Sequence, residues 1–131
     1  MFNDRLHFVI VFFFIKECFY PLGMENGDIL DSQITQPTGD YKGPGDINNA
    51  PWQARLNNPS GNTWIPSQPS EATLIVDLEE VYHVIGIEAH GNSKNPSKPG
   101  YPTHFEIQYK PWLNSLSWVS VHSVSIIIEG A

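Results

Sequence analysis

Residues 72–89, ATLIVDLEEVYHVIGIEA, carry the pattern that decides the fold class. Apolar and polar side chains alternate with a period of two, which is typical of half-buried strands whose successive side chains point to opposite faces. The pattern therefore predicts two strands on either side of Glu79-Glu80. One face of the first strand holds Leu74, Val76 and Leu78; in the second, Val81, His83, Ile85, Ile87 and Ala89 alternate with Tyr82, Val84, Gly86 and Glu88.

The same period recurs further along the chain. HFEIQY, residues 104–109, alternates strictly, so that Phe105, Ile107 and Tyr109 share one face. WVSVHSVSIII, residues 118–128, predicts one or two more strands, and GDILDSQIT, residues 27–35, predicts a short strand around Ile29–Ile34. Each of these stretches is followed or preceded by turn residues rather than by a helical pattern.

The segments between these strands are polar and rich in glycine and proline. With 10 Gly and 11 Pro in 131 residues, helix signals are scarce, and residues 35–51 and 90–103 are predicted to be long loops. Several short strands joined by long loops favour an antiparallel sandwich or barrel. The chain is long enough for one domain, and we expect an all-β fold.

Composition also limits the function. The net charge is −7, from 14 acidic and 7 basic residues, which disfavours a nucleic-acid partner because phosphate binding needs clustered cations. Five histidines and the single cysteine, Cys18, lack metal-ligand spacing. Glu79 and Glu80 are adjacent in a strand pattern and so point to opposite faces. With no nucleophile motif or phosphate loop in the sequence, we expect neither an enzyme nor a cofactor.

Residues 1–17 form a separate, apolar leader. The run HFVIVFFFI, residues 7–15, is much shorter than the roughly 20 residues that span a bilayer. It has the length of the apolar region of a signal peptide, but Lys16-Glu17 follows and no small-residue cleavage site is present. Three interpretations stay open: a signal peptide, a mispredicted or truncated start, and a buried strand.

Seven segments occur in an order that resembles the discoidin domain, also called the coagulation factor V/VIII type C domain. The segments are PLGMENGDILDSQIT, APWQARLN, TWIP, ATLIVDL, VIGIEAHG, FEIQY and SW, and the resemblance runs from Cys18 to about Val121. It implies an eight-stranded, galactose-binding-like jelly-roll sandwich. It also implies a non-catalytic and usually extracellular module for adhesion or lectin-like recognition.

The resemblance places the ligand site in three loops at one end of the sandwich. The first spans residues 36–49, the second 57–62 and the third 92–101. The implied partners are a glycan or an extracellular protein; the alternatives are an anionic phospholipid such as phosphatidylserine, or loops that bind nothing. The residues expected to contact the ligand are Asp40, Tyr41, Lys42, Asn92, Lys94, Lys98 and Tyr101.

Two departures from the family pattern suggest that residues 18–131 are an incomplete domain. Cys18 matches the first cysteine of the family's disulfide, but the chain has no second cysteine. The family's closing strands after Trp118 are also not recognised. We therefore expect a poorly stable domain, which forgoes roughly 2–5 kcal/mol from the bridge. The terminal SIII run could pair as a substitute strand, or the exposed face could drive dimerisation.

The aromatic and arginine residues of the motifs are expected to be structural. Trp64 and Trp118 fall where the family places core or sandwich-edge aromatics, and Trp52 is expected to pack under the first loop. Arg55 is expected to be a semi-buried arginine paired with a carboxylate, because a buried guanidinium needs a partner. Asp77 is the candidate partner.

Overall fold

The computed structural model describes residues 5–9, 20–37, 47–67, 72–91, 104–110, 116–121 and 125–129. In these residues the secondary structure consists of strands and short 3-10 helices, which confirms the all-β prediction. No helix in these ranges is long and apolar enough to cross a membrane. The strands are β1 (Arg5–Val9), β2 (Ile34–Thr35), β3 (Thr73–Val76), β4 (Gly86–His90), β5 (His104–Tyr109), β6 (Val119–Ser120) and β7 (Ser125–Glu129); the 3-10 helices are η1 (Asp31–Gln33), η2 (Ile47–Asn49) and η3 (Pro51–Gln53).

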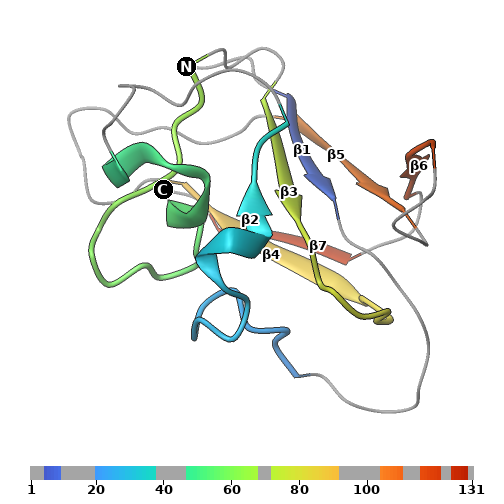
Figure 1. Ribbon diagram of the computed structural model, residues 1–131, viewed down its shortest axis with the longest axis horizontal. Coiled ribbons are helices and arrows are strands. Elements are labelled where there is room, and N and C mark those ends of the chain that lie inside the picture. Colours follow the sequence, from blue (N-terminus) through green and yellow to red (C-terminus); the bar gives the residue numbers. More distant parts are fainter. Residues whose placement is uncertain are drawn as a thin grey trace.

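The strands form a five-stranded sheet, in the order β2-β3-β1-β5-β6, and a two-stranded sheet of β4 and β7 (Figure 1). The pairs β2–β3 and β5–β6 are antiparallel. The strands nearest the chain ends pair differently, because β1 is parallel to both β3 and β5, and β7 is parallel to β4. Antiparallel pairing is thus confined to strands from the interior of the described sequence.

Strand β1 comes from the apolar leader and lies in the middle of the larger sheet. Its residue Phe8 is in register with Leu74 of β3 on one side and with Ile107 of β5 on the other. Of the three interpretations that the sequence leaves open for the leader, the structure has a strand for Arg5–Val9. The strand joins the β2–β3 pair to the β5–β6 pair.

Strand β7 contains the SIII run at the end of the chain. Residues Ile126, Ile127 and Ile128 are in register with Ile87, Glu88 and Ala89 of β4. This run therefore pairs as a strand, one of the two outcomes considered from the sequence. The prediction of one or two strands in residues 118–128 is confirmed by β6 and β7.

The core lies against β2 and β3. Leu74, Val76 and Leu78 are all buried, as the alternation predicts, while Asp77 on the other face is exposed. Ile107 of β5 is also buried. Packing of these side chains removes apolar surface from water, the main favourable contribution to folding. The core cluster comprises Ile29, Ile34, Trp64, Ala72, Leu74, Val76, Leu78 and Val84.

Two strand predictions are wrong in their extent. The second strand was expected from Val81, but β4 begins only at Gly86. The chain turns before it, because Glu79 has a φ of 60° and the Glu80 N–H donates to the Leu78 carbonyl. As a result Val84 is buried, while Val81 and Ile85 are 45% and 46% exposed.

The other correction concerns Ile29–Ile34. The predicted strand is replaced by the 3-10 helix η1, and pairing starts only at Ile34. Gln33 explains this change, because its side-chain oxygen accepts a hydrogen bond from the Leu30 N–H while its own N–H donates to the Leu30 carbonyl. This reciprocal capping closes a turn where the sequence pattern suggested an extended chain. Both isoleucines are nevertheless buried.

Candidate functional site

The strand register defines one end of the five-stranded sheet, which we call the loop end. There β2 finishes while β3, β1 and β5 begin, because β2 runs antiparallel to β3 and the other two run parallel to it. The first predicted loop leaves β2 through Gln36 and Pro37, and the third predicted loop enters β5 at His104. Two segments far apart in sequence therefore join the sheet at the same end (Figure 1).

The residues predicted to contact a ligand lie outside the described residues, and so does the cysteine. Their roles stay predictions. The structure does describe the residues on which these loops are anchored, and the whole of the second loop, 57–62. The predicted residues concerned are Asp40, Tyr41, Lys42, Asn92, Lys94, Lys98, Tyr101 and Cys18.

Hydrogen bonds join the second loop and the residues just after it to both ends of the first loop. Asn62 donates from Nδ2 to Oδ1 of Asn48 over 3.0 Å. Just after this loop, the Ile65 N–H donates to the Asn49 carbonyl over 3.2 Å, and Trp64 Nε1 donates to Gln36 Oε1 over 2.8 Å. Gln36 and Asn49 are the first and last residues of the first loop. The two loops are thus held side by side at their bases.

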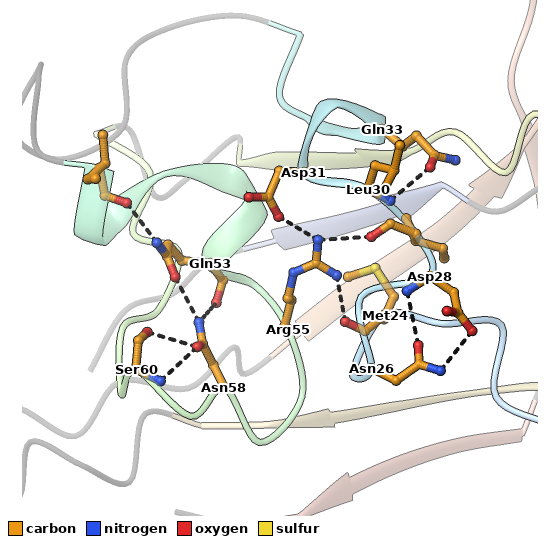
Figure 2. A network of polar contacts seen from close by, with 12 residues as sticks. Met24, Asn26, Asp28, Leu30, Asp31, Gln33, Gln53, Arg55, Asn58 and Ser60 are labelled. Carbon is orange, nitrogen blue, oxygen red and sulfur yellow. Dashed lines mark hydrogen bonds and ion pairs between the residues drawn. The ribbon is translucent and has the colours of Figure 1, made fainter.

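The second loop is shaped by its own amide groups (Figure 2). Asn58 Nδ2 donates to the carbonyl and to Oε1 of Gln53, while Asn58 Oδ1 accepts from the N–H and the hydroxyl of Ser60. Gln53 Nε2 in turn donates to the Ile47 carbonyl in η2. Short polar side chains that bond to nearby backbone favour turns over strands. The loop is therefore organised before any ligand arrives.

Arg55 links the segment before β2 to the segment that leads into the second loop. Its guanidinium donates to the carbonyls of Met24 and Ile29 over 2.8 and 2.9 Å (Figure 2). It also forms an ion pair with Asp31, whose side chain is 63% exposed against 13% for that of Arg55. The predicted semi-buried, paired arginine is confirmed, but the predicted partner is wrong.

Asp77 is engaged elsewhere, which explains why it does not pair with Arg55. Its backbone N–H donates to the Gln33 carbonyl, and its own carbonyl accepts from Gln33 Nε2. Its side-chain Oδ1 accepts from the Glu79 N–H. Asp77 therefore stabilises the turn after β3, where a carboxylate can accept a backbone hydrogen bond that the strand ladder no longer supplies.

The three tryptophans among the described residues divide between core and surface. Trp64 is 9% exposed within the core cluster, which confirms the packing predicted for it. Trp52 is partly buried against that cluster, and its place under the first loop stays a prediction because residues 38–46 lie outside the described residues. Trp118 lies just before the edge strand β6 and is 37% exposed. Lys110 Nζ lies 4.4 Å from the centroid of its ring, at the end of β5 opposite the loop end. Trp118 is thus an edge residue and not part of the core.

The described residues hold no group of three or more His, Cys, Asp or Glu side chains that could bind a metal.

One titratable group among the described residues, Tyr82, has a shifted pKa. The Glu80 carboxylate raises the pKa of Tyr82 above its ordinary value through its negative charge, and its Oε2 accepts a hydrogen bond of 3.3 Å from the Tyr82 hydroxyl. Both residues are exposed and belong to the turn after β3, so we regard this pair as part of the turn.

Sequence reasoning missed the residues that anchor the loops. In the sequence, Gln36 and Asn48 are recognised only as part of the first loop and Gln53 only as part of the motif APWQARLN, although their side chains form hydrogen bonds between segments. One signal was present, since asparagine recurs at positions 48, 49, 57, 58 and 62. Asparagine both donates and accepts through its amide, so such clustering can indicate loops that are bonded to each other.

Comparison with known proteins gives one family. The profile of the F5/8 type C domain matches residues 33–130, beyond Val121, where the recognised motifs end, and through β7. Coagulation factor V of Bos taurus is 34% identical over 109 residues, or 79% of this chain and 4% of that protein. Coagulation factor V of Sus scrofa is 29% identical over 129 residues, or 88% of this chain and 5% of that protein.

The chain thus spans about one twentieth of the length of these relatives. No solved structure matches the chain significantly. The profile match nevertheless covers most of the sequence and includes all strands except β1. The chain therefore belongs to the F5/8 type C, or discoidin, domain family, a family of non-catalytic binding modules.

Proposed function

We propose that this chain is an extracellular adhesion or lectin-like module that binds a glycan or a protein through the three loops at its loop end. The main support is the geometry of their bases. The first loop is bonded to the second by Asn48–Asn62 and to Trp64, just after the second loop, by Gln36, and the third loop enters the sheet at the same end. A surface built from several chain segments on a fixed scaffold is a common site of recognition.

The composition of the first loop favours a polar ligand over a membrane. Its centre reads DYKGPGD, in which Tyr41 is the one large ring. The resemblance to the family implies bulky apolar side chains at this position in members that bind membranes, and burying each such side chain contributes about 1.5–3 kcal/mol. The centre of the first loop lacks that contribution, whereas tyrosine, aspartate and lysine suit contacts with sugar hydroxyls or protein surfaces.

Binding to glycan and matrix-protein arrays tests this proposal. We expect binding that falls when Tyr41→Ala or Tyr101→Ala is introduced. The matched control is Tyr20→Ala, because Tyr20 is 78% exposed but belongs to none of the three loops. Equal loss in the control, or no binding that depends on the loops, would contradict the proposal.

A second candidate is peripheral binding to anionic phospholipid. Lys42, Lys94 and Lys98 support it, since three of the seven basic residues lie in the first and third loops, with Tyr41 as the one anchor. Such binding depends on salt and on the fraction of anionic lipid. Co-sedimentation with vesicles that contain phosphatidylserine discriminates this candidate from the first.

The charge-matched control for the lipid assay is Lys110→Ala. Lys110 follows β5 at the end opposite the loop end, so its loss should leave lipid binding unchanged. Lys94→Ala and Lys98→Ala should each weaken it. Sedimentation that ignores salt and phosphatidylserine content would exclude the lipid candidate and leave the first one standing.

A further inference from the structure

The turn between Gly23 and Ile29 contains the one Asn-Gly pair of the sequence, Asn26-Gly27. An asparagine side chain can react with the backbone nitrogen of the next residue, and glycine favours this reaction because it has no side chain to obstruct the approach. Both residues of the pair are exposed, so water reaches them. A Cβ placed on Gly27 would meet nothing within 4 Å, so the space around this residue is open.

Two hydrogen bonds hold the Asn26 carboxamide in the turn (Figure 2). Its Oδ1 accepts from the Asp28 N–H over 3.1 Å, and its Nδ2 donates to Asp28 Oδ2 over 2.7 Å. The bond to Oδ1 stabilises the negative charge that develops on this oxygen when a nucleophile attacks the side-chain carbon. The Gly27 N–H donates to the Gly23 carbonyl over 3.1 Å, and this bond must open before the nitrogen can react. Exposed backbone hydrogen bonds open by local fluctuation, without unfolding of the whole molecule.

We propose that Asn26 deamidates spontaneously and that the products loosen the turn held by Arg55. The Gly27 backbone nitrogen attacks the carbonyl carbon of the Asn26 side chain and closes a cyclic succinimide. The Asn26 amide nitrogen takes up the proton that the Gly27 nitrogen loses and leaves as ammonia. Water then opens the ring at either carbonyl, so the reaction needs neither an oxidant nor a reductant. Opening at one carbonyl gives aspartate, and opening at the other gives isoaspartate, whose backbone runs through the former side chain.

The position of Asn26 explains why its conversion affects the turn. The Arg55 guanidinium donates to the carbonyls of Met24 and Ile29, which lie on either side of Asn26 in the chain. Isoaspartate inserts a methylene carbon into the backbone between these carbonyls, so they can no longer fit the guanidinium as before. Both products also place a carboxylate where the Asn26 amide donates to Asp28, which replaces an attraction by a repulsion.

The same turn also contacts the second loop directly. Asn57, the first residue of that loop, donates from Nδ2 to Glu25 Oε1 over 2.9 Å. Glu25 immediately precedes Asn26 in the chain. A change in the backbone at Asn26 therefore acts on both attachments of this turn, the one to Arg55 and the one to Asn57.

Incubation of the purified chain at mildly alkaline pH, followed by peptide mapping with mass spectrometry, tests the reaction. We expect aspartate and isoaspartate to accumulate at position 26 at least severalfold faster than at Asn48 or Asn62, which are followed by bulkier residues. Gly27→Ala is the matched control, because its Cβ meets no other group but obstructs the attack, and it should slow the conversion severalfold. The proposal would be overturned if Asn26 converted no faster than Asn62, if Gly27→Ala left the rate unchanged, or if conversion required denaturant.

Hydrogen exchange measures the effect on the turn. The products carry an additional negative charge, so anion exchange separates them from the unmodified chain. The Ile29 amide is the reporter, since its N–H donates to the Gly23 carbonyl across the turn. We expect this amide to exchange severalfold faster in the isoaspartate chain, and less fast in Asn26→Asp, which adds the charge without lengthening the backbone. Equal protection of Ile29 in all three chains would show that the turn tolerates both products, which would overturn the second part of the proposal.

Discussion

The loop region between Tyr20 and Ser67 and the two strands near the chain ends are held in different ways. In the loop region, side chains bond to backbone groups far away in sequence, as Arg55 does with Met24 and Ile29. Strands β1 and β7 join the molecule through parallel backbone pairing along β3, β5 and β4. The first kind of contact depends on particular side chains, whereas strands of many different sequences can form the second.

This difference separates two roles. A guanidinium that fits two carbonyls selects one arrangement of the loops, because few other side chains present donors in that geometry. A backbone ladder can be formed by any strand with a suitable apolar pattern. The side-chain contacts of the loop region therefore fix one arrangement of that region, while the end strands β1 and β7 complete the two sheets. The predictions below test this division, beginning with the largest expected effect.

The largest effect is expected from Phe8→Pro in β1. Proline lacks the N–H that a central strand donates to its neighbours and is found in sheets almost only at edges, bulges or the first residue of a strand. We expect the amides of β3 and β5 to lose their protection in hydrogen exchange, since β1 joins these strands. The amides of the loop region should lose less of their protection.

Arg5→Pro is the matched control, because Arg5 is the first residue of β1 and proline is tolerated there. It should leave the protection of β3 and β5 near that of the unmodified chain. If the amides of β3 and β5 were equally protected in Phe8→Pro and Arg5→Pro, the central position of β1 would be contradicted. The contrast between the loop region and the strands held by backbone pairing would be contradicted as well.

The second prediction concerns Gly23, whose carbonyl accepts hydrogen bonds from the N–H groups of Gly27 and Ile29. Its φ is +109°, and a Cβ at this position would lie 2.5 Å from the Cβ of Asp28. Gly23→Ala combines a left-handed backbone with a clash, so we expect it to lower the free energy of unfolding by about 2–4 kcal/mol. Denaturant unfolding measures the loss.

Gly27→Ala serves as its control. Gly27 also has a positive φ, of +87°, but a Cβ there meets nothing within 4 Å. Its substitution should cost only the backbone strain, roughly 1–2 kcal/mol. If both substitutions cost the same, the close packing of this turn would not contribute to the stability of the loop region.

The third prediction separates the two kinds of contact made by Arg55. Arg55→Ala leaves the Met24 and Ile29 carbonyls without their donor, and we expect a loss of about 1–3 kcal/mol. Asp31→Asn removes only the ion pair and should cost less than about 1 kcal/mol, because Asp31 is mostly exposed. A larger loss from Asp31→Asn than from Arg55→Ala would show that the charge, not the carbonyl contacts, holds this segment.

The sequence predicted the regular parts of the fold and the family. Alternation identified β3 and β5, since a buried face leaves a clear period of two. The alternation gave a wrong prediction after β3, where Glu79 adopts a positive φ and Val84 is buried. An alternating pattern does not indicate where the chain turns. The alternation also could not predict that β1 lies parallel to β3 and β5, because the sequence pattern of a strand does not specify which strands it pairs with.

The candidate site was predictable only in outline. Motif order located the three loops, and Arg55 was recognised as a paired arginine. Its true partner, Asp31, could not be chosen over Asp77, because the choice depends on the turns around Gln33 that bring Asp31 to the guanidinium and engage Asp77 elsewhere. The hydrogen bonds of Asn48 and Gln36 depend in the same way on tertiary contacts between segments.

The smallest predicted effect concerns Tyr82 and Glu80, in the turn that connects the core strand β3 to β4. The charge of Glu80 raises the pKa of Tyr82, because a nearby carboxylate disfavours the phenolate. The native state therefore holds the Tyr82 proton to higher pH than the unfolded chain. The small stability this provides is complete below the ordinary pKa, about 10, and is lost as the pH rises through the raised pKa.

Glu80→Gln should lower the pKa of Tyr82 toward its ordinary value, whereas Glu79→Gln should change it little, because the hydrogen bond is to Glu80. The difference in tyrosinate absorbance between chains with and without Tyr82→Phe isolates this one group. High salt should also reduce the shift, since both side chains are exposed and the interaction is screened. A pKa unaffected by Glu80→Gln and by salt would show that the turn does not hold the two side chains together.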